Sequence, residues 1–223
     1  MWMVLTRDTR RGLAVGAGLA AAAFALAVTF GALAVAGGLP PLAAVIMSAV
    51  TFSGSAQFAF VTALTGSGGV AAGLGTATLM NLRFLPMATA CAPALRGGRV
   101  RRALEAQLVV DGSWAAAQDD QGRVQRSVLI PATVVQWPSW IVGTAIGAYA
   151  APDTALSSSL GLDVVFPAFF AVLVLDIVRR RPELRTVVVA SGVLTLLLLW
   201  VVPVGAALLA GCLPGIRTYL KSS

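Results

Sequence analysis

Long apolar runs, separated by only short polar segments, constrain this sequence more than any other feature. A helix needs about 20 consecutive apolar residues to cross the hydrocarbon core of a bilayer. Runs of about this length or longer occupy residues 13–35, 42–64, 70–95, 128–150, 161–178 and 186–213. Most of the separating segments are rich in Gly, Pro or Arg, as turns between helices are. The pattern predicts an all-α polytopic membrane protein with about six membrane stretches, forming a single integral membrane domain over residues 1–223.

The charged residues support a membrane location and suggest an orientation. Charged residues make up 11% of the chain and hydrophobic ones 58%, whereas a soluble domain carries about 25% charged residues. The net charge of +7 comes mostly from arginine clusters at 7–11, 96–102, 123–126 and 179–185, which flank the apolar runs. Such clusters stay on the cytoplasmic side of a membrane. We therefore expect a multi-pass protein of the inner (cytoplasmic) membrane, with a cytoplasmic N-terminus and the lipid bilayer, not nucleic acid, as its surroundings.

The residue types present argue against an enzyme or a metal protein. Histidine is absent, and the two cysteines, Cys91 and Cys212, lie in apolar runs. An intramembrane hydrolase needs an activating histidine, a zinc-binding HExxH motif or a catalytic aspartate pair. Zinc sites are built from several His, Cys or acidic ligands. We expect no enzymatic activity, no metal and no cofactor.

The arginine clusters also limit how many apolar runs can cross the membrane. If the clusters at 7–11 and 96–102 are both cytoplasmic, the chain must cross the membrane an even number of times between them. Three apolar runs lie between these clusters, and three is an odd number. The run at 42–64 is the best candidate for a run that does not cross the membrane as one continuous helix. It follows two prolines and contains the polar patch FSGSAQF at 52–58. We predict a broken or re-entrant helix there, because irregular backbone at membrane depth must face protein or a water-filled cavity.

The polar patch supplies the first candidate substrate-binding residues, Ser53, Gly54, Ser55 and Gln57. Free backbone N–H groups at the start of a half-helix attract an anionic ligand group. The alternative is close helix packing, for which small and hydroxyl residues are also favoured in membranes.

Arg83 is the most costly residue of the apolar runs, because it lies near the middle of residues 70–95. An arginine at the bilayer centre costs about 2.5–3.5 kcal/mol on insertion scales. Its planar guanidinium matches a carboxylate, so Arg83 and the nearby Asn81 are predicted to bind substrate in a polar cavity. Two alternatives remain: a structural ion pair with an acidic residue, and a run boundary that places Arg83 near the membrane surface.

Asp111 and Asp163 are candidates for proton or ion coupling. Asp111 lies in the short amphiphilic segment 103–118, and Asp163 lies near the start of the 161–178 run. Capping of a helix N-terminus is the alternative role for Asp163. Trp137 and Trp140 are explained by the usual enrichment of Trp at membrane interfaces.

The sequence contains a weak sign of internal duplication. Each half offers three apolar runs, and a Gly-Leu pair precedes the second run of each, at Gly38-Leu39 and Gly161-Leu162. Internal repeats are common in secondary transporters. An internal structural repeat is therefore one possibility for the fold.

Two segments, GLPPLAAVIMSAVTFSGSAQF from Gly38 and NLRFLPMATACAP at 81–93, resemble the AzlC/YgaZ family. Its members are large subunits of branched-chain amino acid exporters, permeases of the azaleucine-resistance type. The resemblance covers about residues 12–215, and the GLD motif at 161–163 belongs to it. It implies export of branched-chain or other hydrophobic amino acids and a small AzlD/YgaH-type membrane subunit as partner.

The sequence departs from the family pattern at two places. Phe84 follows the NLR motif where the family often has His, and only Asp111 remains of a Thr-Asp-Glu trio. Two groups that could carry protons are therefore missing. Substrate or coupling can therefore differ from those of other members. The sequence predicts a secondary transporter subunit, with proton antiport as one candidate for its coupling. A channel or a non-transporting scaffold subunit is the alternative, since broken helices also build pores.

Overall fold

A computed structural model describes residues 7–65, 69–150, 171–172, 174–175, 177–202, 207, 210–211 and 213–222. Within these ranges the regular structure is helical, apart from one isolated antiparallel bridge between Gln118 and Val124. The prediction of an all-α fold is therefore confirmed for the described part. Its helices are α1 (Arg7–Ala36), α2 (Pro41–Thr51), α3 (Gly54–Thr65), α4 (Gly69–Asn81), α5 (Phe84–Cys91), α6 (Arg99–Ala106), α7 (Asp111–Ala116), α8 (Arg126–Ala150), the 3₁₀ helix η1 (Pro182–Leu184), α11 (Arg185–Leu198) and α13 (Leu213–Ser222).

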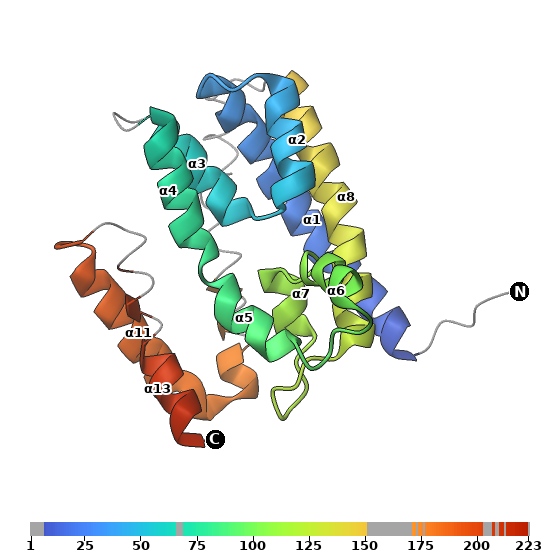
Figure 1. The fold of residues 1–223 in the computed structure, drawn as a ribbon, viewed down its shortest axis with the longest axis vertical. Helices are drawn as coiled ribbons and strands as arrows, with labels where there is room; N and C mark the ends of the chain where they lie inside the picture. Colours follow the sequence, from blue (N-terminus) through green and yellow to red (C-terminus); the bar gives the residue numbers. More distant parts are fainter. Residues whose placement is uncertain are drawn as a thin grey trace, which may run out of the picture.

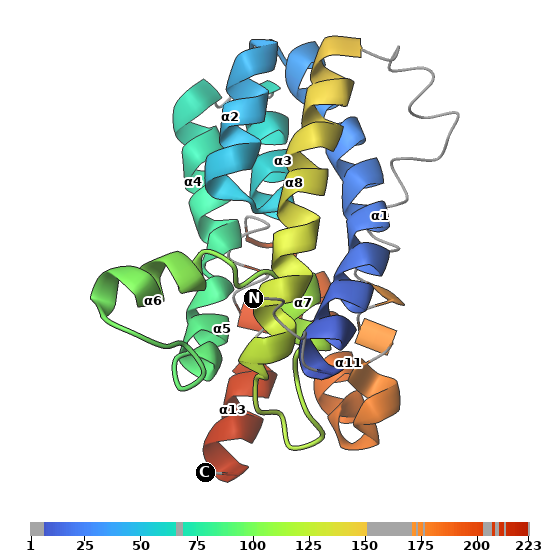
Figure 2. The same ribbon diagram turned by 90° about the vertical axis from the view of Figure 1, so that its right-hand side faces the viewer.

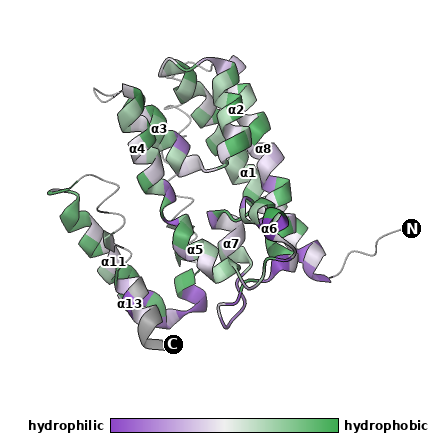
Figure 3. Cartoon of the chain, in the orientation of Figure 1, coloured by the Kyte–Doolittle hydropathy of each residue, from purple (hydrophilic) through white to green (hydrophobic). Residues whose placement is uncertain are grey.

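Two of the described helices, α1 and α8, are long and apolar enough to cross a membrane, judged by length and composition. Hydrophobic residues extend along these helices and along α2 to α4, whereas hydrophilic residues gather mainly at the end that holds α6 (Figure 3). Six membrane stretches and an internal repeat remain predictions, because most of the 161–178 run lies outside the described residues.

Helices α1 and α8 pack side by side and run in the same direction (Figures 1 and 2). An ideal Cβ added to Gly12 would lie 2.7 Å from the carbonyl oxygen of Val128, and one on Gly16 would lie 2.7 Å from that of Ala132. The two backbones are in direct contact, as in other membrane helix pairs joined by small residues. Since the helices are parallel, their basic N-terminal ends lie at the same end of the molecule, as the positive-inside rule requires.

The predicted break in the 42–64 run is present. Helix α2 ends at Thr51, and Phe52 follows in the left-handed region with φ 37° and ψ 50°, where a bulky residue cannot continue a helix. Helix α3 then begins at Gly54 and ends at Thr65. An ideal Cβ on Gly37, which precedes α2, would lie 2.8 Å from Cγ2 of Thr65. The α2–α3 pair thus starts and finishes at the same end of the molecule, as a re-entrant helical hairpin does (Figure 1).

A second break, which the sequence pattern did not predict, divides the 70–95 run. Helix α4 ends at Asn81, and α5 begins at Phe84 with Arg83 as its N-cap residue. Pro86 explains the break, because it has no N–H to donate to the carbonyl of Leu82 four residues earlier. That carbonyl instead accepts a hydrogen bond from the backbone N–H of Leu85 at 3.0 Å. Arg83 therefore lies at a helix junction and not inside a continuous helix.

Helix α6 lies across the direction of α1 and α8 (Figure 2) and is fixed by Glu105. The Nε of Arg126, the first residue of α8, donates to Oε2 of Glu105 at 2.9 Å, and Nε of Arg101 donates to Oε1 at 3.3 Å. The backbone N–H of Arg96 also donates to Oε2, at 3.1 Å. The hydrogen bond from Arg126 is the main cause that lowers the pKa of Glu105 from its ordinary value of 4.5 to about 2.

Acid should weaken the attachment of α6 to α8. Because the folded-state pKa of Glu105 lies below its ordinary value, its stabilising contribution is complete above pH 4.5 and disappears as the pH falls through about 2. A Glu105→Gln variant should have a lower Tm than the parent at neutral pH, and this difference should shrink as the pH falls below 4.5. Thermal unfolding in detergent measures both, with Glu183→Gln, an exposed acid in η1, as the control. A Tm difference that stays constant over this pH range would contradict the assignment.

Candidate functional site

Three interruptions of the helices meet at one place in the fold. The hydroxyl of Ser53, between α2 and α3, donates a hydrogen bond of 2.7 Å to Oδ1 of Asn81, at the end of α4. Arg83, between α4 and α5, contacts Asp111, the first residue of α7. The predicted candidates Ser53, Asn81, Arg83 and Asp111 are therefore brought together from segments far apart in the sequence.

Arg83 and Asp111 form a bidentate ion pair. The Nε and Nη2 atoms of Arg83 donate to Oδ1 and Oδ2 of Asp111 at 3.0 and 2.8 Å, and Nη1 donates to the carbonyl of Met80 at 2.9 Å. The guanidinium also lies 4.7 Å from the centre of the Phe84 ring. Both paired side chains are 23% exposed. In this state Arg83 has the geometry of the structural ion pair that was one alternative for it, and a carboxylate offsets the cost of its charge.

A cavity of about 60 Å³ lies next to this ion pair, on the Asp111 side. This is enough space for several water molecules, since about 10–15 Å³ of it can hold one. Among the described residues, its lining includes Asp111 but not Arg83. The lining residues are Ala23, Leu26, Phe52, Ser53, Gly54, Ser55, Val110, Asp111, Gly112, Gln136 and Trp140.

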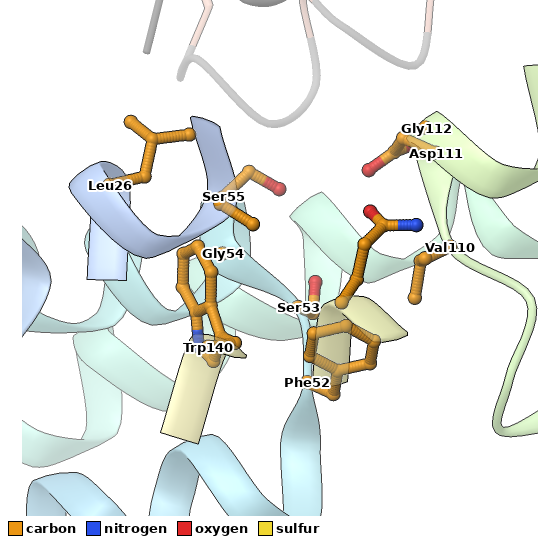
Figure 4. A pocket seen from close by; sticks show the side chains of 11 residues that line it. Leu26, Phe52, Ser53, Gly54, Ser55, Val110, Asp111, Gly112 and Trp140 are labelled. Atoms are coloured by element: carbon orange, nitrogen blue, oxygen red, sulfur yellow. The ribbon is translucent and has the colours of Figure 1, made fainter. Parts of the chain in front are cut away.

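The N-terminus of α3 forms one wall of this cavity. The N–H of Gln57 donates to the carbonyl of Ser53 at 3.0 Å, so the preceding N–H groups of the first turn have no acceptor within the helix. The hydroxyl of Ser55 is buried and has no hydrogen-bond partner among the described residues. The side chains of Ser55 and Asp111 point toward one another (Figure 4). The cavity thus lies between the positive end of a helix dipole and a carboxylate.

Gln57 occupies a different position from the one predicted for a wall of this cavity. Its side chain is 1% exposed, its Nε2 donates to the hydroxyl of Ser48 at 2.9 Å, and its Oε1 accepts from Nε1 of Trp140 at 3.0 Å. Ser48 is in turn hydrogen-bonded to Thr144 at 2.8 Å. This buried network ties α2 and α3 to α8. Together with Asn81, Gln57 lines a second cavity, of about 240 Å³, between α2, α3 and α4.

Sequence reasoning missed two residues of α8 that line the cavity beside Asp111. The interpretation of Trp140 as an interfacial residue was wrong, because Trp140 is 4% exposed and donates to Gln57. Gln136 is also 4% exposed, and its Nε2 donates to the carbonyl of Ala132 at 3.1 Å. The signal was their spacing of four residues, which places both on one face of an apolar helix.

The remaining candidate, Asp163, and the GLD motif that contains it lie outside the described residues. Within the part of the chain that the structure describes, no group of three or more His, Cys, Asp or Glu residues is placed to hold a metal ion. Cys91 is buried, as expected for an apolar thiol.

Comparisons with known proteins agree on one family. The family described as "AzlC protein" matches residues 18–152, a range that includes every residue lining the cavity beside Asp111. The chain is also 28% identical over 210 residues to a protein of Escherichia coli (strain K12) named inner membrane protein YgaZ. That similarity covers 87% of this chain and 82% of the relative. No solved structure matches the chain.

Proposed function

The chain belongs to the AzlC family, and we propose from this that it is the large subunit of a secondary transporter for amino acids. The family is one of membrane transport components and not of enzymes. The substrates proposed are branched-chain or other hydrophobic amino acids, exported across the cytoplasmic membrane in exchange for protons. The proposal includes a small AzlD/YgaH-type subunit, a single membrane domain and a cytoplasmic N-terminus. The name of its relative, an inner membrane protein, supports this location.

One observation carries the choice of substrate: the cavity beside Asp111 has opposite charges on opposite walls. A free amino acid has a carboxylate and an ammonium group on the same carbon atom. The first N–H groups of α3 have no acceptor within the helix, and the Ser55 hydroxyl has no partner in the described part of the chain; both suit the carboxylate. The carboxylate of Asp111 suits the ammonium group. Leu26 and Val110, which also line this cavity, suit an apolar side chain.

In this proposal Arg83 acts through Asp111 and does not bind the substrate itself. Its two hydrogen bonds hold the Asp111 carboxylate in place. Each carboxylate oxygen keeps a second lone pair, which remains available to the ammonium group. This role replaces the predicted contact between Arg83 and the substrate carboxylate.

Proton coupling follows from the same carboxylate. A proton and the ammonium group compete for Asp111. Protonation removes the negative charge that attracts the ammonium group, so the two do not bind strongly at the same time. A proton that binds Asp111 therefore releases the amino acid. This exchange of a proton for an amino acid is antiport. Asp163 stays a second coupling candidate. A cavity of about 60 Å³ must also widen to admit an amino acid, as alternating access requires.

The proposal is tested with the chain and its small subunit reconstituted in vesicles that contain labelled valine or leucine. A pH gradient should drive saturable transport. Ser55→Ala should weaken the apparent affinity roughly 10- to 100-fold, because one hydrogen bond to a charged group is lost. Ser127→Ala, at an exposed position near the start of α8, is the matched control. Transport at the same rate with and without the pH gradient would favour a channel. If neither valine nor leucine is transported, the proposed substrate is wrong.

A further inference from the structure

Helix α6 presents an apolar face away from the rest of the described protein. Val100 and Leu104, four residues apart and therefore on one face, are 77% and 67% exposed. Glu105 lies on a different side of the helix, where it is buried against Arg126. The function proposed above makes no use of this exposed face.

The position of α6 matches the surface of a bilayer. The hydrogen bond of 2.9 Å between Arg126 and Glu105 holds α6 at the first residue of α8, which is also the first residue of a candidate membrane span. The helix lies across the direction of α1 and α8 (Figure 2). It lies beside the N-terminal part of α8 (Figure 2). A helix that crosses neighbouring spans near one of their ends can lie in the plane of the membrane interface.

The positive charge of α6 and of the loop before it favours lipids with anionic head groups. Residues 96–106 contain four arginines and one glutamate, a net charge of +3. Arg99, Arg101 and Arg102 are exposed, and the first two immediately flank Val100 in the sequence. Arg101 also donates to Glu105 at 3.3 Å, and Nη2 of Arg102 donates to the carbonyl of Ala92 at 2.9 Å. Arginine side chains beside an apolar face extend to the polar side of an interface. Anionic phospholipids complement this charge.

We propose that α6 is an interfacial helix that binds the anionic phospholipids of the leaflet at the N-terminal ends of α1 and α8. Val100 and Leu104 lie at the boundary of the acyl chains, and the exposed arginines contact the phosphodiester groups. A protein partner fits this face less well, because two apolar side chains fall far short of the roughly 1,000 Å² that a specific protein interface buries.

The proposed lipid contact lies close to the cavity beside Asp111. The Nε2 of Gln107, directly after α6, donates to the carbonyl of Val50 in the last turn of α2 at 2.8 Å. Four residues separate Ala106, the end of α6, from Asp111. Lipid bound at α6 therefore restrains the segment that carries Asp111 and the end of the α2–α3 hairpin.

Hydrogen exchange of α6 in the full chain tests the proposal. The protein is placed in vesicles of phosphatidylcholine, either pure or mixed with one quarter phosphatidylglycerol. Exchange of residues 99–106 should slow in the mixed vesicles, by about five-fold for each arginine engaged. Raising the salt to 0.5 M should remove the difference, because it shortens the screening length.

Variants separate the charge from the apolar face. Arg99→Gln/Arg102→Gln should lose the dependence on phosphatidylglycerol. Val100→Ser/Leu104→Ser should exchange faster in both kinds of vesicle. The matched control, Arg7→Gln/Arg10→Gln, removes the same charge from exposed positions of α1 and should leave α6 unchanged.

Three results would overturn the proposal. The first is equal exchange of α6 in the two kinds of vesicle. The second is protection that appears only when the small membrane subunit is added, which would make the face a protein interface. The third is equal protection by inorganic phosphate in pure phosphatidylcholine, which would make it a simple anion site. Because the readout is exchange and not transport, none of these results bears on the proposed substrate.

Discussion

Replacing Arg83 with alanine should reduce transport roughly 30- to 150-fold. The substitution removes both hydrogen bonds that hold the carboxylate of Asp111 and leaves a partly buried charge without a partner. Breaking a fully buried ion pair costs about 3–5 kcal/mol. Since both side chains are 23% exposed, we expect about 2–3 kcal/mol. Taken as the cost of placing the Asp111 carboxylate for the ammonium group, this gives the stated range. Release of labelled valine or leucine from the reconstituted vesicles measures the effect.

Further substitutions distinguish loss of stability from loss of function. Arg83→Lys keeps the charge but not the bidentate geometry, so its transport should lie between that of the parent and Arg83→Ala. The double variant Arg83→Met/Asp111→Leu removes both charges. Its free energy of unfolding should exceed that of Arg83→Ala. Its transport should be absent, because the Asp111 carboxylate that binds the ammonium group has been removed. Arg123→Ala, at an exposed arginine with its own acidic partner Asp119, is the control. An Arg83→Ala variant that folds normally and transports at the parental rate would remove Arg83 from the site.

Replacing Gly147 with leucine should separate α1 from α8 and deplete the folded protein. An ideal Cβ at this position would lie 2.8 Å from the carbonyl carbon and 3.0 Å from the Cα of Val28. These are backbone atoms of α1 that cannot rotate away, so the helices must move apart. Inserting side-chain atoms into a well-packed contact costs about 1–3 kcal/mol, and sometimes more. We expect at least about 3 kcal/mol here, seen as a lower Tm and a lower yield of monodisperse protein.

A matched control exists on the other helix of the same pair. No atom lies within 4 Å of an ideal Cβ on Gly18 of α1, so Gly18→Leu adds the same side chain without a clash. Its Tm should stay within a few degrees of the parent. Equal Tm values for the two variants would show that α1 and α8 are not in the described contact.

The sequence predicted those features that depend on local composition or on charge. The long apolar runs predicted α8 and the C-terminal end of α1 to within two residues, whereas α1 begins six residues before its run. The count of crossings between arginine clusters predicted the break at residues 52–53, because membrane orientation makes a charge pattern informative over long distances. Asp111 was also selected as a functional acid, since its short segment is amphiphilic, but its pairing with Arg83 was not assigned.

Features that depend on which helices are neighbours were not predicted. The pairing of α1 with α8 joins residues more than a hundred positions apart, and periodicity within one run carries no information about its partner. The available signal was the spacing of Gly12 with Gly16 and of Gly143 with Gly147, four residues apart in both helices, which is typical of close membrane helix pairs. The second break was missed because Pro86 lies beyond the junction that it disrupts.

The parallel pairing of α1 with α8 also fixes the order of events during synthesis. Gly12 contacts Val128, which the ribosome adds 116 residues later, the difference between 128 and 12. At about 5–20 residues per second, this delay is roughly 6 to 23 s. Throughout that time the glycine face of α1 has only lipid or the insertion machinery against it. Helix α1 can pack against α2 and α3 early but must wait for α8, and a slow or interrupted translation lengthens the period in which the chain is open to misassembly.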